Sequence, residues 1–381
     1  MDLHKNFKSI NIGILGGGQL GRMFIQNALN YNLIISVLDA DALAPCAKIA
    51  DNYFVGDITD FNTVLEFGKT VELITIEIEN VNCDALFELE KLGKKVFPQA
   101  RVIKLIQDKG LQKQFYLENN FPTSPFKLIN AKEDLKSLSE EWFPSFIKMR
   151  KAGYDGKGVI QLKDKMLIEN AFDVPSILER RIKIDTEFAI ITAANGVEVK
   201  AFPAVDMLFH GEANLVEFLS SPSAIKPNIL EEAEKMAIAI TKKLEIRGLL
   251  AIEFFLDKEG RIFVNEMAPR PHNSGHHTIE ANKTSQFDQF LRAIMGWPLG
   301  ETDLLKASVM VNVLGEDGFN GNAVYEGIDE ILGCEGVYVH LYGKRNTKPF
   351  RKMGHVTITD DSLERAIKIG NFVKKTLKVK S

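Results

Sequence analysis

Two glutamates in the second half of the chain have the type and spacing to hold a metal ion. Leu249–Leu256 and Ile262–Glu266 are rich in apolar and β-branched residues, and they flank the polar tetrapeptide Asp257–Gly260. This pattern predicts a β-hairpin with a four-residue turn. Glu253 and Glu266 are therefore expected on adjacent strands of one hairpin.

The register of this hairpin decides whether the two carboxylates meet. If Leu256 pairs with Arg261, then Glu253 faces Val264, and Glu266 lies diagonally beside Glu253 on the same face. Two carboxylates on one apolar surface repel each other unless a cation lies between them, and Mg²⁺ carrying nucleotide phosphates suits that position. Either glutamate alone is more simply interpreted as a hydrogen-bonded core carboxylate, so the metal site depends on the pair.

Directly after the hairpin come four side chains that handle anions and protons. Arg270, His272, Asn273 and His276 follow one another, separated by Pro and Gly. An arginine fork binds carboxylate or phosphate, and histidine exchanges protons near neutral pH. The segment therefore predicts a site for a small anion next to the metal.

A glycine-rich turn near the N-terminus predicts a second ligand site. The apolar strand Ile10–Leu15 leads into Gly16–Gly21, and a second strand, Leu33–Leu38, ends at Asp39. This spacing fits a dinucleotide fingerprint, which by itself would favour NAD. Its physical basis is only that backbone N–H groups at a helix N-terminus approach an anion, so a substrate phosphate or ribose would satisfy it equally well.

A third strand of the same region ends in polar residues. Leu73–Ile78 carries Thr75, Glu77 and Glu79 at its carboxyl edge, where open parallel sheets bind ligands. Strands and helices alternate up to about Gln107, which predicts a small doubly wound α/β domain.

A glycine-rich loop with cations is predicted near the middle of the chain. Lys151–Gly158 contains three glycines among Lys and Asp, between the predicted strands Phe146–Lys148 and Val159–Leu162. Such a loop suits a lid over polyphosphate, although a plain hairpin turn fits its composition about as well. Lys148 lies in an otherwise apolar strand, where an amine is costly to bury without an anion.

The C-terminal part carries a cluster of positive charge. Five cations occur between Lys344 and Lys352, in a protein whose formal net charge is −4. A charged loop is most simply solvated, but in this acidic chain the cluster is a candidate anion site.

Length and composition limit the class of protein. A chain of 381 residues with 45% hydrophobic and 26% charged residues predicts two or three globular domains. The net negative charge argues against nucleic acid or a membrane as a partner. Cys46, Cys83 and Cys334 lack metal-binding spacing and predict free thiols in a reducing compartment. Because the N-terminus has no apolar signal core, we expect the cytoplasm.

Other elements are expected to position these residues. A composition shift near Pro98–Asp108 predicts a domain boundary, followed by a helix over Asp108–Asn119. An amphipathic helix over Asn228–Arg247 is expected to stop at Gly248 and to serve packing alone. Further strands are predicted at Ile177–Glu179, Glu187–Thr192, Val197–Phe202, Ser308–Leu314 and Gly336–Leu341, and a further helix at Phe287–Met295.

Four motifs in this order carry a resemblance that covers nearly the whole chain. They are GGGQLGRM at 16–23, GYDGKG at 153–158, NEMAPRPHNSGH at 265–276, and YGK and RKMGHV within 342–356. Together they resemble the family of 5-(carboxyamino)imidazole ribonucleotide synthases, ATP-grasp ligases that form the ATPase subunit of phosphoribosylaminoimidazole carboxylase in purine biosynthesis.

The resemblance implies the architecture. It combines α/β and α+β parts: a doubly wound pre-ATP-grasp domain over 1–108, an ATP-grasp domain over 109–300 with a lid subdomain at about 123–185, and a small β-rich C-terminal domain over 301–381. It also implies a homodimer that acts on 5-aminoimidazole ribonucleotide, bicarbonate and ATP.

The resemblance also implies a nucleotide site. Lys148 and Lys157 would bind ATP phosphates, with Gly153–Gly158 as the lid. Glu179 would lie in the hinge segment that holds adenine, and Glu187 would bind ribose. Glu253 and Glu266 would hold Mg²⁺, with two ions expected and Mn²⁺ as a substitute. The full set implied for nucleotide binding is Lys109, Lys148, Gly153, Tyr154, Asp155, Gly156, Lys157, Gly158, Glu179, Arg180, Arg181, Ile182, Glu187, Asn265 and Glu266.

Substrate and catalytic residues are implied in the same way. The ribonucleotide would face Gln19, Leu20 and Glu77, with its 5′-phosphate on Lys344, Arg351 and Lys352. The catalytic residues would be Arg270, His272, Asn273 and Lys344, and the first three would surround bicarbonate and the carboxyphosphate formed from it. His272 as the base is a hypothesis, with a role in positioning as the alternative. The glycine-rich turn would then be a substrate site.

Three positions depart from the family pattern. Lys109 stands where the family often has Arg, which keeps the charge but loses the bidentate fork. Phe202–Asp206 replaces the family's usual Pro-x-x-Glu-Asn, so the equivalence of His210 to the family His stays open. Arg180 and Arg181 make the hinge more basic than usual.

Three alternatives compete with this function. A formate-dependent glycinamide ribonucleotide transformylase would share the three-part layout. An NAD-dependent oxidoreductase would rest only on Gly16–Gly21 and Asp39, and would leave the paired carboxylates without a role. A non-catalytic nucleotide-binding regulator would bind ATP without releasing ADP.

Overall fold

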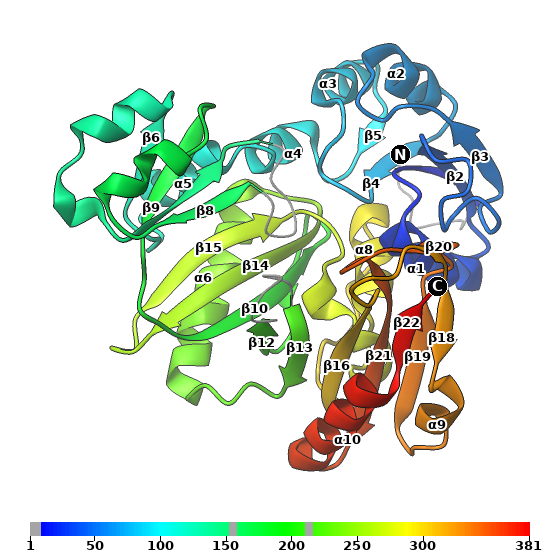
Figure 1. Ribbon diagram of the computed structural model, residues 1–381. Coiled ribbons are helices and arrows are strands. Elements are labelled where there is room, and N and C mark those ends of the chain that lie inside the picture. The colour runs from blue at the N-terminus through cyan, green and yellow to red at the C-terminus, as the bar shows by residue number, and fades with distance from the viewer. Residues whose placement is uncertain (1–8, 152–157, 210–215) are drawn as a thin grey trace.

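The computed structural model describes residues 9–151, 158–209 and 216–381. Figure 1 shows a parallel sheet at the N-terminal end, a small antiparallel sheet set to one side, and a large antiparallel sheet that continues into the C-terminal part. Within the described ranges, no helix is long and apolar enough to cross a membrane.

The N-terminal part is a five-stranded sheet in the order β3-β2-β1-β4-β5, with every neighbouring pair parallel. The strands are β1 (Asn11–Leu15), β2 (Ile34–Asp39), β3 (Asn52–Val55), β4 (Leu73–Ile76) and β5 (Lys95–Val96). The helices are α1 (Gln19–Ala28), η1 (Leu29–Tyr31), α2 (Phe61–Lys69), α3 (Cys83–Lys91) and α4 (Ala100–Ile106). The predicted doubly wound fold is confirmed, and it follows from short Ile/Leu/Val strands that helices cover.

The three N-terminal strands with predicted ranges, β1, β2 and β4, agree with them to within two residues, whereas no range was predicted for β3 or β5. β4 ends at Ile76 rather than at Ile78, so Glu77 and Glu79 lie in the turn that follows the strand. The predicted boundary region is itself helical, because α4 occupies most of it.

The small antiparallel sheet has the order β6-β9-β7-β8. Its elements, together with the helix that precedes it, are α5 (Lys109–Glu118), β6 (Phe126–Ile129), η2 (Lys132–Ser137), η3 (Glu140–Trp142), β7 (Ser145–Met149), β8 (Val159–Leu162), η4 (Lys165–Asn170) and β9 (Ser176–Arg180). Asp108 caps α5, since its side chain accepts hydrogen bonds from the Gly110 and Leu111 backbone N–H groups. The loop between β7 and β8 belongs largely to 152–157, outside the described residues.

The large sheet has nine strands and spans the remainder of the chain. Its path is β15-β14-β10-β12-β13-β16-β21-β19, with β11 beside β10. The elements before residue 300 are β10 (Ile184–Ala194), β11 (Val199–Ala201), β12 (Val205–Phe209), β13 (Val216–Ser221), α6 (Pro227–Leu244), β14 (Gly248–Asp257), β15 (Ile262–Ala268), η5 (Asn273–Gly275), α7 (Thr278–Ala281) and α8 (Gln286–Met295).

The C-terminal part shares this sheet. Its elements are β16 (Ala307–Leu314), β17 (Gly321–Asn322), β18 (Val324–Glu326), α9 (Ile328–Leu332), β19 (Val337–Leu341), β20 (Asn346–Thr347), β21 (Lys352–Asp360), α10 (Leu363–Thr376) and β22 (Lys378–Lys380). β13 pairs with β16 in antiparallel register. Three C-terminal strands, β16, β21 and β19, therefore extend the large sheet (Figure 1), whereas β17 pairs with β20 and β18 pairs with β22 in two separate two-stranded sheets.

The predicted end of the long helix is wrong by a few residues. α6 ends at Leu244, and Glu245 takes the left-handed conformation (φ 48°) that closes it. Gly248 instead begins β14 with φ +137°, and a Cβ there would lie 3.3 Å from the Phe290 ring. The glycine is needed because the strand passes close to α8.

Candidate active site

The β14–β15 hairpin is shifted from the expected register. Leu256 pairs with Ile262, not with Arg261, and Phe254 pairs with Val264. The side chain of Asp257 explains the difference: it accepts hydrogen bonds from the backbone N–H groups of the turn, at Glu259 and Arg261. This side-chain cap holds Arg261 within the turn, and the ladder starts one residue later than predicted.

A β-bulge then brings the predicted carboxylates together. Beyond Phe254 the register shifts, and Ile252 pairs with Met267. Glu253 is therefore opposed by two residues, Asn265 and Glu266, both partly exposed. The extra residue turns both polar side chains toward the Glu253 side, while the flanking apolar residues remain in the core.

The two carboxylates of the hairpin differ in their affinity for a proton. Burial raises the pKa of Glu253 to about 8, and the nearby charge of Glu266 adds to this. The ammonium group of Lys109, which forms an ion pair with Glu266, lowers the pKa of that carboxyl to about 2. Burial opposes the charge on Lys109, but Glu266 outweighs it and raises the Lys109 pKa.

The hairpin fits a magnesium ion delivered with nucleotide phosphates. Asn265 Nδ2 lies 3.4 Å from Glu253 Oε2, so an amide lies beside the two carboxylates. Among the described residues, no group of three or more His, Cys, Asp or Glu side chains is arranged to hold a metal. Mg²⁺ usually takes only one or two protein carboxylates and completes its shell with phosphate and water, so the pair suffices.

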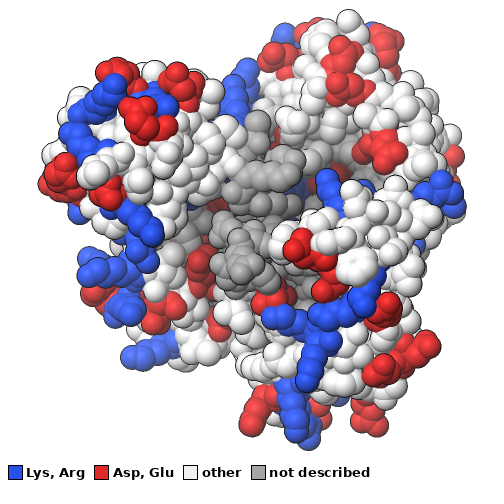
Figure 2. All heavy atoms as spheres, viewed as in Figure 1, with Lys and Arg blue, Asp and Glu red and all other residues white. Residues whose placement is uncertain are grey.

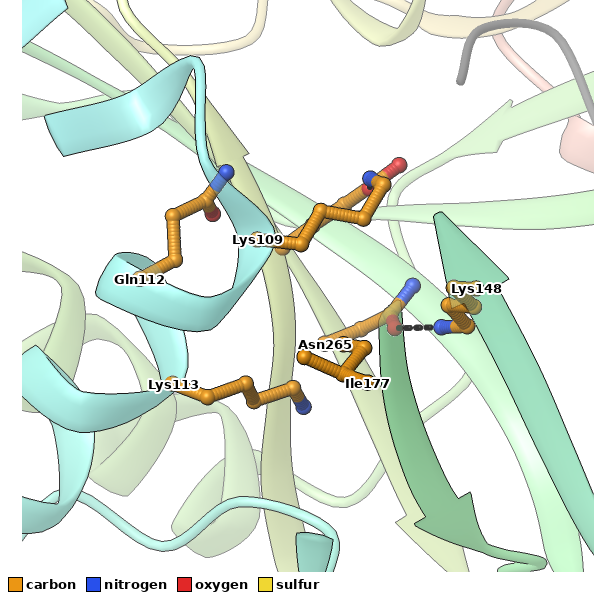
Figure 3. A pocket seen from close by; sticks show the side chains of 7 residues that line it. Lys109, Gln112, Lys113, Lys148, Ile177 and Asn265 are labelled. Atoms are coloured by element: carbon orange, nitrogen blue, oxygen red, sulfur yellow. Dashed lines mark hydrogen bonds and ion pairs between the residues drawn. The ribbon is translucent and has the colours of Figure 1, made fainter. Parts of the chain in front are cut away.

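Three lysines converge on this hairpin. Figure 3 shows Lys109 and Lys113 extending from α5, and Lys148 from β7, into the pocket that Asn265 also lines. Lys148 Nζ lies 2.6 Å from Glu179 Oε2 and 3.3 Å from Asn265 Oδ1. The sequence predicted that Lys148 needs an anion, and the Glu179 carboxylate supplies one.

Lys113 was missed from the sequence. Its side chain is 3% exposed and forms an ion pair with Glu179, which is 4% exposed. Burial opposes ionisation of Glu179, but Lys113 and Lys148 outweigh it and lower the Glu179 pKa to about 2. Burial lowers the pKa of Lys113 despite the same contact. Its i, i+4 spacing from Lys109 on one helix was the signal that could have identified it.

The lysines and acids neutralise one another at the place where the nucleotide is expected. The three lysines and Glu266, together with Gln112, Ile177 and Asn265, line a cavity with a volume of about 10 Å³ (Figure 3). A nucleotide phosphate would offer the lysines a second anion, and a metal ion would offer Glu266 a second cation. The charges of the site thus match those of a metal nucleotide.

Glu187, the expected ribose ligand, lies on the same face of the sheet. It is opposite Phe255, two residues along β14 from Glu253. Burial raises the pKa of Glu187 to about 7, against the attraction of Lys148. A carboxyl that is partly protonated at neutral pH can both donate and accept hydrogen bonds.

The expected hinge residues follow directly. Arg180 ends β9, and the exposed Arg181 donates its backbone N–H to Pro144 O, with the half-buried Ile182 next in the chain. The expected lid residues Gly153, Tyr154, Asp155, Gly156 and Lys157, as well as His210, lie outside the described residues. Gly158 is described and has φ +78°.

The glycine-rich turn is organised by two carboxylates of the protein itself. Asp39 accepts a hydrogen bond from Gly17 N at 2.6 Å, and Glu77 accepts one from Leu20 N at 3.1 Å. A Cβ on Gly18 would lie 2.4 Å from Glu77 Oε1. Asp39 is thus engaged inside the turn, where a dinucleotide would need it for ribose.

Burial raises the pKa of Glu77, while Leu20 N–H, Arg270 and Lys344 act in the opposite direction. The expected substrate residues Leu20, Glu77 and Lys344 are therefore close in space although they come from both ends of the chain. Gln19 is the first residue of α1, next to Leu20. Arg22, which was not predicted, also lies near this C-terminal segment: its Nη1 would be 3.5 Å from a Cβ built on Gly343, the residue before Lys344.

The segment after the hairpin joins the two predicted sites. Arg270 Nε lies 2.9 Å from Glu79 Oε1, in the turn that follows the N-terminal β4. His272 Nε2 lies 3.6 Å from Glu253 Oε1, and His272 Nδ1 lies 2.9 Å from Ser274 Oγ. Both polar atoms of the Asn273 side chain are buried, and neither has a hydrogen-bond partner among the described residues.

The C-terminal cations are held by backbone oxygens. Lys344 Nζ donates to Lys352 O at 2.7 Å, and Arg351 donates to Asn346 O. Lys344 also lies over the Tyr342 ring at 5.5 Å. On the face in Figure 2, Lys and Arg are interspersed with Asp and Glu over the described surface.

Comparisons with known proteins agree with this fold. Three family models match consecutive parts of the chain: a ribonucleotide synthetase preATP-grasp domain over 9–107, an ATP-grasp domain over 114–287, and a phosphoribosylaminoimidazole carboxylase C-terminal domain over 308–369. The N5-carboxyaminoimidazole ribonucleotide synthase of Bacillus subtilis is 34% identical over 354 residues, covering 91% of this chain and 90% of that protein.

The chloroplastic phosphoribosylaminoimidazole carboxylase of Vigna aconitifolia is 36% identical, but the match covers only 64% of that longer protein and 92% of this chain.

Solved structures give the same result. The N5-carboxyaminoimidazole ribonucleotide synthetase of Thermotoga maritima has a TM-score of 0.89 and 38% identity, with 98% of this chain and 99% of that chain covered. The enzyme of Aspergillus clavatus in complex with ADP and 5-aminoimidazole ribonucleotide has a TM-score of 0.86 and 28% identity, with 95% and 96% covered. The ATP-grasp fold is thus that of a known ligase group, and this chain belongs to the N5-carboxyaminoimidazole ribonucleotide synthase family.

Proposed function

We propose that the protein carboxylates the exocyclic amine of 5-aminoimidazole ribonucleotide at the expense of ATP. A bicarbonate oxygen attacks the γ-phosphorus and ADP leaves, which gives carboxyphosphate. The amine nitrogen then attacks the carboxyl carbon and displaces phosphate, or it attacks the CO₂ that carboxyphosphate releases along with phosphate; in either case a proton is lost. The product is 5-(carboxyamino)imidazole ribonucleotide, an intermediate of purine biosynthesis.

The observation that carries this proposal is the contact between Arg270 and Glu79. Arg270 follows the carboxylate hairpin, whereas Glu79 follows β4 beside the glycine-rich turn, and their side chains lie 2.9 Å apart. A reaction that transfers a group from a nucleotide-activated anion to a second substrate needs two sites that meet at one point. The Arg270 segment is that meeting point.

On the nucleotide side the protein supplies position and charge. Lys148 and Lys109 would bind ATP phosphates, with Glu187 near the ribose. Glu253 and Glu266 would hold Mg²⁺, which supplies neutralisation of charge on the transferred phosphoryl group. Glu179 orients Lys148 through the ion pair at 2.6 Å. Because the Glu179 carboxylate is occupied in this way, adenine would be bound by the backbone of Glu179 or by the neighbouring residues.

On the carboxylation side the protein binds anions and moves protons. Arg270 offers its guanidinium to bicarbonate and carboxyphosphate. His272 lies where it can take a proton or hold the carboxylated species in place, and the buried amide of Asn273 has both its donor and its acceptor unused within the described part of the chain. Lys344, Arg351 and Lys352 would bind the 5′-phosphate, next to Glu77 and Gln19.

The experiment that tests the function measures ADP release with Mg-ATP and 5-aminoimidazole ribonucleotide, with bicarbonate added or rigorously depleted. ADP release that requires both bicarbonate and the ribonucleotide is the expected result. If ADP release instead requires formate and glycinamide ribonucleotide, the proposed substrates are wrong and the protein is a different ATP-grasp ligase. If no ADP is released under any condition, the protein binds nucleotide without catalysing this reaction.

We also propose a homodimer in the cytoplasm. The support for the dimer is the family resemblance, and sedimentation velocity at several concentrations tests it; a monomer throughout would refute it. The support for the compartment is that Cys46, Cys83 and Cys334 are all free thiols. Cell fractionation tests this.

A further inference from the structure

A buried glutamine holds the catalytic segment from behind. Gln286 is the first residue of α8, and its side chain is completely buried. Its Oε1 accepts a hydrogen bond from His272 N at 2.8 Å, and its Nε2 donates to His272 O at 2.8 Å. The same Nε2 lies 3.0 Å from His276 Nδ1. One side chain therefore binds both backbone groups of His272 and the ring of His276.

These contacts leave one orientation for the amide. A backbone N–H can only donate and a backbone carbonyl can only accept, so Oε1 must face His272 N and Nε2 must face His272 O. The atom next to His276 Nδ1 is then an N–H donor. His276 Nδ1 must carry a lone pair, which makes its ring neutral, with the proton on Nε2.

The loop is pressed tightly against this amide. A Cβ on Gly275 would lie 2.5 Å from Gln286 Oε1. Thr278 completes the clamp, because its hydroxyl donates to Gly275 O and accepts from Gln286 N. The backbone from His272 to Thr278 is thus fixed at both of its ends by the start of α8.

The neutral ring of His276 faces the C-terminal part of the protein. Its centroid lies 4.7 Å from that of His355 on β21, whose Nδ1 lies 3.0 Å from the Tyr342 hydroxyl. Tyr342 is followed within two residues by Lys344. Burial lowers the pKa of His276 well below its ordinary value, with the charges of its neighbours acting in the same direction, which agrees with a neutral ring at this junction.

We propose that Gln286 is a positioning residue for the carboxylation reaction: it holds the His272 backbone and the Nε2–H tautomer of His276, and thereby aligns Arg270–Asn273 with the C-terminal phosphate site. It acts through these residues and does not itself reach the substrates. The proposal rests on the proposed function, because it concerns the segment that would bind bicarbonate.

The chain provides a matched control one helical turn later. Gln289 lies on the same helix and is also completely buried. Its Nε2 donates to Gly300 O at 3.0 Å, and its Oε1 accepts from Gly300 N at 2.8 Å. Residue type, burial and the two-point backbone clamp are the same, but the clamped loop is not part of the candidate active site.

The test compares Gln286→Glu and Gln286→Leu with Gln289→Glu and Gln289→Leu in the full-length protein. Both pairs lose a buried clamp and are expected to lower the melting temperature to a similar extent. At a temperature where all four are folded, the Gln286 variants should lower kcat for bicarbonate-dependent ADP release by about 10- to 100-fold, with KM for ATP within about twofold. The Gln289 variants should keep kcat within about twofold of the wild type.

Equal losses of kcat at the two positions, or Gln286 variants that fail to fold where the Gln289 variants fold, would assign Gln286 a structural role only and overturn the proposal. Nitrogen chemical shifts of the His276 ring in the unaltered protein give an independent readout. An unprotonated Nδ1 at neutral pH is expected, and a protonated Nδ1 would contradict the clamp. If the wild type shows no bicarbonate-dependent release, the proposed function fails while the tautomer result still stands.

Discussion

Glu266 lies on the same side of the β14–β15 hairpin as Glu253 because a β-bulge places two residues of β15 opposite one residue of β14. In a regular ladder the residues at 265 and 266 would point to opposite faces. The bulge therefore decides that both carboxylates meet, and that the amide of Asn265 joins them. Bulges are frequent beside active sites, where they redirect a side chain.

The first prediction concerns this pair. Glu253→Gln and Glu266→Gln should each lower kcat at least about 100-fold, because each removes one of two carboxylates that act together on one ion. The double variant should be little worse than either single variant, since groups that act as a unit are non-additive. Glu259→Gln, in the exposed turn of the same hairpin, should leave kcat unchanged. Additive losses would contradict a shared ion.

The second prediction concerns protons. The pKa of Glu253 is raised to about 8, so at pH 7 this carboxyl is mostly protonated before metal nucleotide binds. Binding of Mg-ADP should release up to about one proton at pH 7, and the release should fall as pH rises through 8. Calorimetry in buffers of different ionisation enthalpy measures it. Because the pKa of Glu187 is also raised, the informative quantity is the difference from Glu253→Gln; no difference would contradict the assignment.

The third prediction concerns stability. Glu179 has its pKa lowered to about 2 by Lys113 and Lys148, which outweigh burial. A lowered pKa in the folded state stabilises the fold above the unfolded value near 4.5, and this contribution is lost as pH falls from 4.5 toward 2. The difference in unfolding free energy between wild type and Glu179→Gln should therefore be full at pH 7 and shrink below about pH 4.5. A difference that grows on acidification would refute this.

A fourth prediction separates buried from exposed ion pairs. Lys113→Met leaves Glu179 with one partner in a buried place, and should cost about 3–5 kcal/mol of unfolding free energy. Lys69→Met removes an exposed pair with Glu66 and should change stability by less than about 1 kcal/mol. Chemical denaturation at pH 7 measures both. Similar effects of the two substitutions would show that burial does not control the cost.

The fifth prediction concerns the glycine-rich turn. Gly18→Ala places a Cβ 2.4 Å from Glu77 Oε1, so the carboxylate must move away from its hydrogen bond with Leu20. We expect KM for the ribonucleotide to rise about tenfold or more, with KM for ATP nearly unchanged. Gly333→Ala is the control, because its nearest contact is an ordinary 3.4 Å and its φ is −75°. A rise in KM for ATP instead would make the turn a nucleotide site.

Much of the fold could be predicted from the sequence because local patterns are strong there. The strands β1, β2 and β8 and the helices α5 and α8 lie within two residues of the expected ranges, since apolar periodicity and capping residues act over short distances. The C-terminal domain was predicted, but its attachment to the large sheet was not. Its β16 pairs with β13, and strand pairing across some 90 residues leaves no local signal.

The sequence determined which chemical groups the site contains, and the tertiary structure determined which of these groups contact one another. The order of motifs was sufficient to assign the family, and Glu253, Glu266 and Arg270 were recognisable by type and spacing. Three features could not be recognised from the sequence: the bulge, the pairing of Glu179 with Lys113, and the clamp of Gln286 on His272. Each of these depends on register or on contacts between distant segments, which the packing of the whole chain decides and no local pattern records.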